Sequence, residues 1–387
     1  MSAAEPARKP TPKSAPRLDI DGVLDTKRIV VCCGSGGVGK TTTAAALALR
    51  AAERGRKVVV LTIDPARRLA QSLGLSELDN VPALVVGAGQ NGGELHAMML
   101  DMKGTFDEIV VTHTTPDKAQ QILENPFYKS LSGSLAGTQE YMAMEKLGQL
   151  HASGMWDLIV VDTPPTRSAL DFLDAPERVS SFLEGRMMRM LLAPAKMGSR
   201  AYLKLFSAGV GVFTAILTKI TGADLLRDVS NFLAASESTF GGFGERAKQT
   251  YELLKHDETA FVVVATPEPA ALREASYFVE RLTSERMPLA GLVVNKVHRT
   301  DEPKLTAERS IAAAETLEER GIEPLARAAL LVHADRVRMA TRERQVISGF
   351  VGTAPRVPMA EIDAMATDVH DLDGLRVIGA ALASQPD

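Results

Sequence analysis

The sequence predicts an α/β fold, a doubly wound and mainly parallel sheet with an inserted α-helical subdomain. Two observations lead to this prediction. Short, almost continuously apolar runs such as VVVLTI and FVVVAT alternate with longer segments that have the period of an amphipathic helix. A glycine-rich turn directly follows the first apolar run of the chain, which ends at Cys33. The chain has 387 residues, 45% of them apolar and 24% charged, which is enough for a core and excludes general disorder.

The apolar runs are typical of strands that are covered on both faces, because they show no polar alternation. In chain order the predicted strands are Arg28–Cys33, Lys57–Ile63, Glu94–Asp101, Trp156–Asp162, Ala260–Thr266, Pro288–Asn295 and about Ala328–Val332. Helical segments between them act as crossovers, so the strands that they connect are expected to be parallel. The clearest predicted helices are Thr42–Glu53, Thr138–His151, Pro269–Glu285 and Leu305–Arg320.

The domain organisation follows changes in composition. Residues 1–25 are expected to form a disordered tail, because the first 17 contain four prolines and four basic residues but no apolar cluster. The α/β core is expected to cover residues 26–178 and 239–375, with the inserted helical subdomain at 179–238 and a C-terminal tail at 376–387. No apolar stretch follows the N-terminal basic residues, so we expect no signal peptide and a cytoplasmic location.

The inserted segment differs in charge from the rest of the chain. Between Gly185 and Ala223 there are six basic residues and no acidic residue, whereas the whole chain has a net charge of −4. Four methionines lie in the same stretch, and its most apolar part, Leu205–Leu217, is too short to span a bilayer as a helix. Two interpretations stay open. The segment forms a surface for a hydrophobic client or for peripheral membrane contact, or it is a set of core methionines beside a solvated basic face.

The remaining composition excludes several classes of protein. The two cysteines, Cys32 and Cys33, are adjacent, which excludes a disulfide scaffold and a cysteine-rich metal cluster within one chain. Both are expected to be small core residues. The net negative charge argues against binding to nucleic acid over the whole surface, so no nucleic-acid partner is expected.

The strongest chemical signal is the segment GSGGVGKT at Gly34–Thr41, which matches G-x-x-x-x-G-K-[ST] between an apolar strand and a helix. Its backbone N–H groups and the N-terminus of the following helix are suited to bind phosphate oxygens. The loop residues expected to do so include Gly36, Gly37, Val38 and Gly39. Lys40 is expected to reach the β- and γ-phosphates, and the hydroxyl of Thr41 to ligate Mg²⁺. The fold is therefore expected to be that of a P-loop NTPase.

Two aspartates lie at the carboxyl ends of predicted strands. Asp162 ends Trp156–Asp162, where the Mg²⁺ shell of a P-loop protein is completed. Asp64 follows Lys57–Ile63, where a carboxylate could orient or deprotonate the water that attacks the γ-phosphate. Taken alone, Asp162 could simply cap the next helix, and Asp64-Pro65 could simply start a turn.

At these motifs the sequence resembles the arsenical-pump ATPase family, which includes the tail-anchored-protein targeting ATPase and belongs to the deviant-Walker class. The resemblance rests on GSGGVGKTTTAAALA, TIDPARRLA, GTQEYMAME and VVDTPPTRSALDFL, in this order. It implies ATP or ADP and Mg²⁺ as ligands. Residues Gly36 to Thr42 would bind the phosphates, including Thr42 at the start of the helix. The resemblance also implies that Asp64 activates the water, that Asp162 supports the metal, and that Glu268 and Asn295 contact the nucleotide, with Asn295 reading adenine.

One departure from the family pattern affects the expected oligomer. Family members usually carry a second lysine where this chain has Ser35, and in a face-to-face dimer that lysine reaches the nucleotide of the opposite subunit. Three explanations stay open: slow hydrolysis, pairing with a paralogue that donates the lysine, or replacement by Arg167, which stands where a glycine is usual. The paired-cysteine zinc clasp of the targeting branch and a metalloid-binding cysteine site are both absent from the sequence.

The expected function is that of a Mg²⁺-dependent ATPase that works as a nucleotide-switched dimer, preferably with a paralogue that carries the second lysine. Its client would be hydrophobic or associated with a membrane. The first alternative is a largely inactive nucleotide-binding subunit of a heteromeric complex. A weaker alternative is a partitioning-type ATPase, which is disfavoured because no basic stripe follows Arg344 at the C-terminus.

Overall fold

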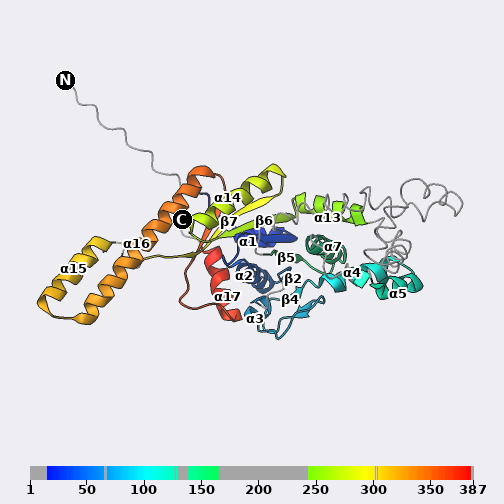
Figure 1. Cartoon of the computed structure of the whole chain (residues 1–387), viewed down its shortest axis with the longest axis horizontal. Helices are drawn as coiled ribbons and strands as arrows, with labels where there is room; N and C mark the ends of the chain where they lie inside the picture. The colour runs from blue at the N-terminus through cyan, green and yellow to red at the C-terminus, as the bar shows by residue number, and fades with distance from the viewer. Residues whose placement is uncertain are drawn as a thin grey trace, which may run out of the picture.

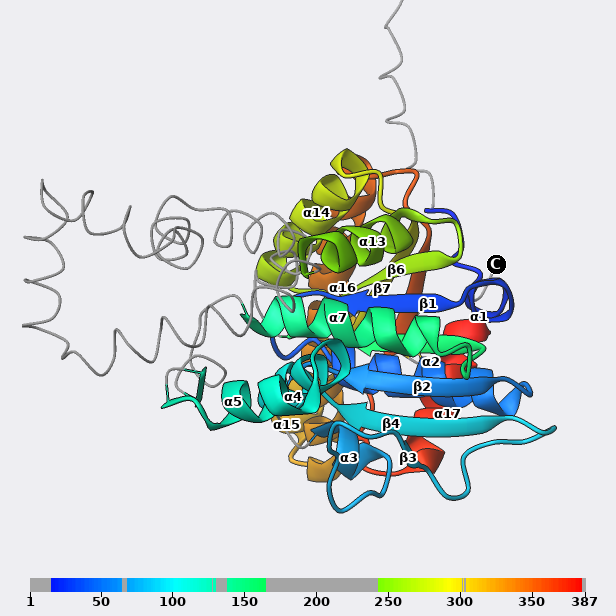
Figure 2. The same ribbon diagram turned by 90° about the vertical axis from the view of Figure 1, so that its right-hand side faces the viewer.

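The computed structural model describes residues 15–64, 68–126, 128–129, 138–164, 243–300, 302 and 304–384. Within these residues, one sheet of eight strands forms the centre of the molecule, in the order β3-β4-β2-β5-β1-β6-β7-β8 (Figures 1 and 2). All neighbouring strands are parallel except β3 and β4, which are antiparallel. The doubly wound, mainly parallel α/β fold predicted from the sequence is confirmed. The strands are β1 Ile29–Cys33, β2 Lys57–Thr62, β3 Ala83–Leu84, β4 Glu94–Met99, β5 Leu158–Asp162, β6 Thr259–Ala265, β7 Leu289–Val297 and β8 Met359–Asp363.

The central strands are buried along their whole length, which explains their continuous apolar runs. Every residue of β1, β5 and β6 is buried, because helices cover both faces of the sheet. Helices α2 and α17 pack against each other on one face, and α7 and α13 lie on the other (Figure 2). The described helices are α1 Ile20–Thr26, α2 Lys40–Glu53, α3 Arg68–Ser72, α4 Met102–His113, α5 Pro116–Glu124, α7 Thr138–Ala152, α13 Phe243–Lys255, α14 Pro269–Ser284, α15 Ala307–Arg320, α16 Pro324–Thr353 and α17 Leu372–Ala383.

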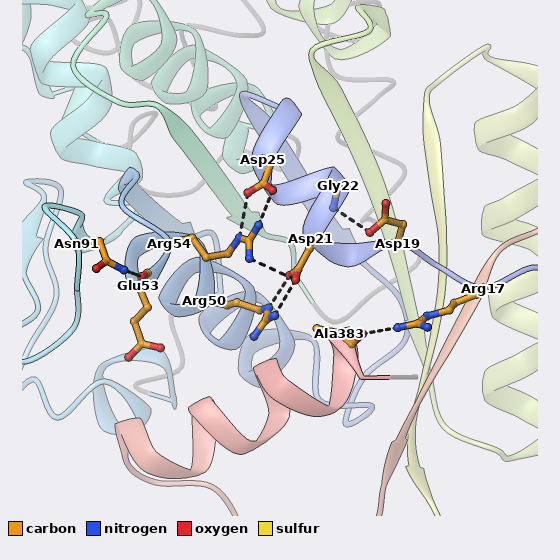
Figure 3. A network of polar contacts seen from close by, with 10 residues as sticks. All are labelled: Arg17, Asp19, Asp21, Gly22, Asp25, Arg50, Glu53, Arg54, Asn91 and Ala383. Carbon is orange, nitrogen blue, oxygen red and sulfur yellow. Dashed lines mark hydrogen bonds and ion pairs between the residues drawn. The ribbon is translucent and has the colours of Figure 1, made fainter. Parts of the chain in front are cut away.

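The structure corrects the expected N-terminal boundary. Residues 15–25 were expected to belong to a tail, but Leu18, Ile20 and Leu24 are almost fully buried in the main core. Helix α1 begins with an Asp19 side chain that accepts a hydrogen bond from the Gly22 N–H. It is joined to α2 by ion pairs from Arg50 to Asp21 and from Arg54 to both Asp21 and Asp25 (Figure 3). The hydrogen bonds from Arg50 hold the pKa of Asp21 below its usual value.

The segment before α1 also pairs with the last strand of the sheet. The Leu18 N–H donates to the Met359 carbonyl at 3.0 Å, and the Met359 N–H donates to the Pro16 carbonyl at 2.8 Å. At the other end of the chain, α17 runs to Ala383 and buries Leu375, Ile378 and Leu382. The expected C-terminal tail at 376–387 is therefore helical over most of its length.

The prediction of a strand at about Ala328–Val332 is wrong. These residues lie inside α16, which is 30 residues long and forms a hairpin with α15 that projects from the body of the molecule (Figure 1). The strand that completes this side of the sheet is β8 instead. The proposed insert at 179–238, with its basic and methionine-containing stretch, lies outside the described residues. Among the described helices, none combines the length and the apolar composition that spanning a bilayer requires.

Candidate functional site

The candidate site lies where β1, β2 and β5 end. Thr62 of β2 and Cys32 of β1 are both in register with Asp162, the last residue of β5, so the three strands end almost level. The glycine-rich loop after β1 and Asp64 after β2 consequently lie at the same edge of the sheet. This is the edge at which open α/β sheets bind their ligands.

The loop after β1 turns directly into α2, and its conformation depends on glycine. Gly39 is the N-terminal cap of α2 and has φ of 92° in the left-handed region. A Cβ atom at Gly39 would lie 2.3 Å from Nδ2 of Asn295. Both the backbone conformation and the lack of space therefore require glycine at this position.

Lys40 points into the loop that precedes it. Its side chain is almost fully buried, and its Nζ donates a 2.8 Å hydrogen bond to the carbonyl of Ser35. Burial lowers the pKa of Lys40, and the nearby carboxylate of Asp162 opposes that change. The ammonium thus lies within the loop that the sequence predicts to bind phosphates, beside a carboxylate of opposite charge.

Asp162 is completely buried between the loop and β2. Burial raises its pKa to about 6, while the hydroxyls of Thr41 and Thr62 oppose the increase. Thr62 donates a 3.0 Å hydrogen bond to Oδ2, whereas Oδ1 has no hydrogen-bond partner among the described residues. A buried carboxylate oxygen without a hydrogen-bond partner destabilises the folded state unless a ligand binds to it. The Thr41 hydroxyl and this oxygen are the hard oxygen donors that Mg²⁺ prefers, so these two residues fit the metal.

Asp64 is half-buried and begins the segment after β2. Its charge acts on both Lys40 and Asp162, so the three ionisable groups form one electrostatic unit. The preceding residue, Ile63, is held from two sides. Its N–H donates to the Asp162 carbonyl at 3.0 Å, and its carbonyl accepts a 2.8 Å hydrogen bond from the side chain of Gln139.

Asn295 lies on the other side of the loop, at the end of β7. Its Nδ2 donates to the carbonyl of Val38 at 2.8 Å, and its Oδ1 accepts from the N–H of Lys296 at 2.9 Å. Both ends of the amide therefore already have a protein partner. One N–H and one lone pair stay available for a nucleotide base.

Glu268 is exposed and caps α14 without donating or accepting a side-chain hydrogen bond there. It lines a cavity of about 510 Å³ that the loop residues Gly36, Gly37 and Val38 also line. Ser35, Glu274 and Lys296 line the same cavity. The residues that the sequence singled out thus fall on two sides of one loop, with Lys40, Asp64 and Asp162 on one side and Glu268 on the other.

Three residues in this region are not predicted from the sequence: Thr62, Gln139 and Lys296. Each contacts the site through a tertiary hydrogen bond. Thr62 and Gln139 lie within the motifs TIDPARRLA and GTQEYMAME, but nothing in these motifs indicates the contacts that the two side chains make. Cys32 and Cys33 are buried and free, as expected of core residues, and burial raises the pKa of Cys33 to about 12. Arg167 lies outside the described residues.

Comparisons with known proteins identify the family of this chain and several relatives. A family model described as an anion-transporting ATPase matches residues 27–320. The chain is 29% identical over 280 residues to an ATPase ASNA1 homolog of Cryptosporidium parvum (strain Iowa II), which covers 71% of this chain and 66% of that relative. It is 24% identical over 285 residues to an ATPase get3 of Pyrenophora tritici-repentis, an alignment that covers 72% of this chain and 76% of that relative. It is 26% identical over 274 residues to an ATPase get3 of Aspergillus terreus, an alignment that covers 70% of this chain and 74% of that relative.

Proposed function

The chain belongs to the anion-transporting ATPase family and is an ATP-binding ATPase; from this we propose that it acts as a Mg²⁺-dependent switch whose hydrolysis is completed by a partner subunit. The observation that supports the catalytic part is the convergence of a buried Lys40, a half-buried Asp64 and a fully buried Asp162 at one strand edge. The groups needed for phosphate binding, water activation and metal binding are then within one electrostatic unit.

The proposed chemistry is transfer of the γ-phosphoryl group to water. The water oxygen forms a bond to the γ-phosphorus, the bond from that phosphorus to the ADP oxygen breaks, and Asp64 orients the water and accepts its proton. Residues Gly36 to Thr42 bind the phosphates through backbone N–H groups, and Lys40 neutralises charge on the β- and γ-oxygens. Thr41 and Asp162 would hold Mg²⁺, which stabilises negative charge on the phosphate oxygens when it is bound.

The proposed partner is a paralogue that carries the second lysine. Ser35 lies in the loop and lines the same cavity as Glu268, but a serine side chain has neither the charge nor the length to reach the nucleotide of another subunit. In a dimer of two identical chains both sites would lack this cation, whereas a paralogue could supply it to the site of this chain. We further propose a hydrophobic or membrane-associated client and a cytoplasmic location with peripheral membrane contact.

The test of the catalytic proposal is phosphate release by the purified chain, alone and mixed with a candidate paralogue that has the second lysine. We expect the mixture to exceed the sum of the separate rates by tenfold or more, since cations of this kind contribute large factors to phosphoryl transfer. Replacing Asp64→Asn should lower the rate of the mixture about a hundredfold, while the exposed control Asp117→Asn in α5 should leave it unchanged.

Two outcomes separate this proposal from the alternative of an inactive nucleotide-binding subunit, which Ser35 also favours. If Asp64→Asn leaves the rate of the mixture unchanged while ATP still binds, the chain is the inactive subunit and the partner performs the chemistry. If the chain alone reaches the full rate of the mixture, the paralogue proposal is wrong.

A further inference from the structure

One strand end beside the phosphate loop departs from regular β geometry. The register between β7 and β8 shifts between Val294 and Val297, and Lys296 within this bulge has φ of 63°. In a regular strand neighbouring side chains point to opposite faces. The bulge instead allows Asn295 and Lys296 to contact the same loop.

The left-handed backbone at Lys296 is unusual for its position. Three other non-glycine residues that the structure describes have positive φ, namely Asn91, Arg286 and Glu323, and each lies in a connection between elements. Lys296 lies inside a strand. A side chain with a Cβ atom rarely adopts this conformation, and glycine would adopt it at lower cost. Strain of this kind at a site indicates a role for the residue that bears it.

Two neighbouring side chains hold two neighbouring carbonyls of the loop. Nδ2 of Asn295 donates to the Val38 carbonyl at 2.8 Å, and Nζ of Lys296 donates to the Gly37 carbonyl at 3.3 Å. The backbone N–H of Lys296 donates to Oδ1 of Asn295 at 2.9 Å and so fixes which way the amide points. We call this pair of residues with its three hydrogen bonds the Asn295–Lys296 clamp.

The clamp determines where the loop N–H groups point. In a planar trans peptide the carbonyl of one residue and the N–H of the next point in opposite directions. When the carbonyls of Gly37 and Val38 face the clamp, the N–H groups of Val38 and Gly39 must face away from it. Phosphate binding by such a loop requires several N–H groups to point at one centre.

We propose that Lys296 is a positioning residue for the phosphates of ATP, acting through Gly37: with Asn295 it orients the N–H groups of Val38 and Gly39 toward the phosphate site before the nucleotide arrives. This role of Lys296 is part of the proposed function and rests on its premise that ATP binds at this loop. The left-handed backbone at Lys296 is the geometric condition for the clamp, because it brings the second side chain to the loop that Asn295 already contacts.

The experiment is a titration of the full chain with ATP and, separately, with pyrophosphate, in three variants at one position. Lys296→Met removes the donor and should lower the affinity for both ligands about tenfold, since a hydrogen bond from a charged group is lost. Lys296→Arg keeps a charged donor and should restore affinity to within a few-fold. The matched control is Lys118→Met, an exposed lysine of α5, which should leave both affinities unchanged.

The third variant separates binding from stability. Lys296→Gly removes the donor but relieves the left-handed backbone, so we expect weaker binding of both ligands together with a melting temperature raised by about 2–4 °C. If Lys296 had only a structural role, binding would fall only in variants whose melting temperature also falls.

Three results would overturn the clamp. If the affinity for ATP is unchanged in both Lys296→Met and Lys296→Gly, the clamp is wrong but the proposed function is unaffected. A loss for ATP without a loss for pyrophosphate would show that Lys296 contacts the base rather than orienting the phosphate site. If the unsubstituted chain binds neither ligand, both the clamp and the proposed function are wrong.

Discussion

The side-chain amide of Gln139 donates a 2.8 Å hydrogen bond to the backbone carbonyl of Ile63, the residue before Asp64. Gln139 lies in the first turn of α7, and α7 packs against α13 on the same face of the sheet. The position of the proposed water-activating carboxylate is therefore tied to a helix that is far from it in the sequence.

Removing this hydrogen bond should affect turnover more than binding. In Gln139→Ala we expect kcat to fall about fivefold, because one net hydrogen bond of about 1 kcal/mol no longer positions Asp64, while the KM for ATP stays within twofold. Gln149→Ala, near the other end of α7, is the control. A change confined to KM would contradict the proposed role of Asp64 in the chemical step.

Glycine substitutions in the loop should separate backbone strain from steric conflict. Gly39 and Gly37 both have positive φ, of 92° and 78°, but an added Cβ would lie 2.3 Å from Nδ2 of Asn295 only at Gly39 and would meet nothing within 4 Å at Gly37. We expect Gly37→Ala to lower the free energy of unfolding by about 1–2 kcal/mol through strain alone. Gly39→Ala should cost about 1–3 kcal/mol more, because it also breaks the bond from Asn295 to Val38. Denaturant unfolding without nucleotide measures both, and equal losses would show that the clash relaxes freely.

The buried carboxyl of Asp162 predicts a pH dependence of stability. Its pKa is raised to about 6 from a normal value of 3.8, so between about pH 4 and pH 6 the folded state holds a proton that the unfolded state has lost. The free energy of unfolding should therefore fall as pH rises through this window, by about 3 kcal/mol in total.

Asp162→Asn should remove this slope, because the amide does not titrate, and should raise stability at pH 7.5 by up to about 3 kcal/mol. The measurement is denaturant unfolding at several pH values with EDTA and without nucleotide. Asp117→Asn is the control for an exposed aspartate. A variant that is less stable than the parent at pH 7.5 would show that ionised Asp162 is favourable in the folded state.

The pair of Arg246 and Glu145 should be important for stability. Glu145 of α7 is almost fully buried and accepts hydrogen bonds of 3.0 Å at both carboxylate oxygens from Nε of Arg246 on α13. Arg246→Met leaves the buried carboxylate without this cation and should cost about 3–5 kcal/mol. Adding Glu145→Gln should recover most of the loss, and Lys248→Met on the same helix should have little effect. If the two losses simply add in a double-mutant cycle, the pair is not coupled.

The fold could be predicted from the sequence wherever local pattern and final environment agree. The runs that became β1, β2, β5 and β6 are apolar because both sides of the sheet are covered, so their pattern directly reports their burial. Ala328–Val332 was wrongly predicted as a strand because a short apolar run has the same appearance in a strand and in a long helix. The true strand, β8, contains Glu361 and Asp363, and these charges concealed it.

The site was predictable to the extent that it depends on chain order. The loop residues and Asp162 follow strands in patterns that have a chemical meaning in sequence alone. Thr62, Gln139 and Lys296 do not, because each reaches the site through a register, a helix position or a bulge that forms only in the folded chain. The sequence around α1 is typical of a tail, because its buried residues, Leu18 before the helix and Ile20 and Leu24 within it, are too few to stand out beside the prolines that precede them.

The hydrogen bonds between Pro16, Leu18 and Met359 have a consequence for self-association. β8 is the outermost strand on its side of the sheet, and an outer strand with unpaired main-chain groups is a template for pairing with another molecule. The segment before α1 occupies the donor and the acceptor of Met359, and Pro16 has no N–H with which to extend the pairing. Residues 16–18 thus shield the sheet, and a chain shortened to begin after them would be expected to aggregate along β8.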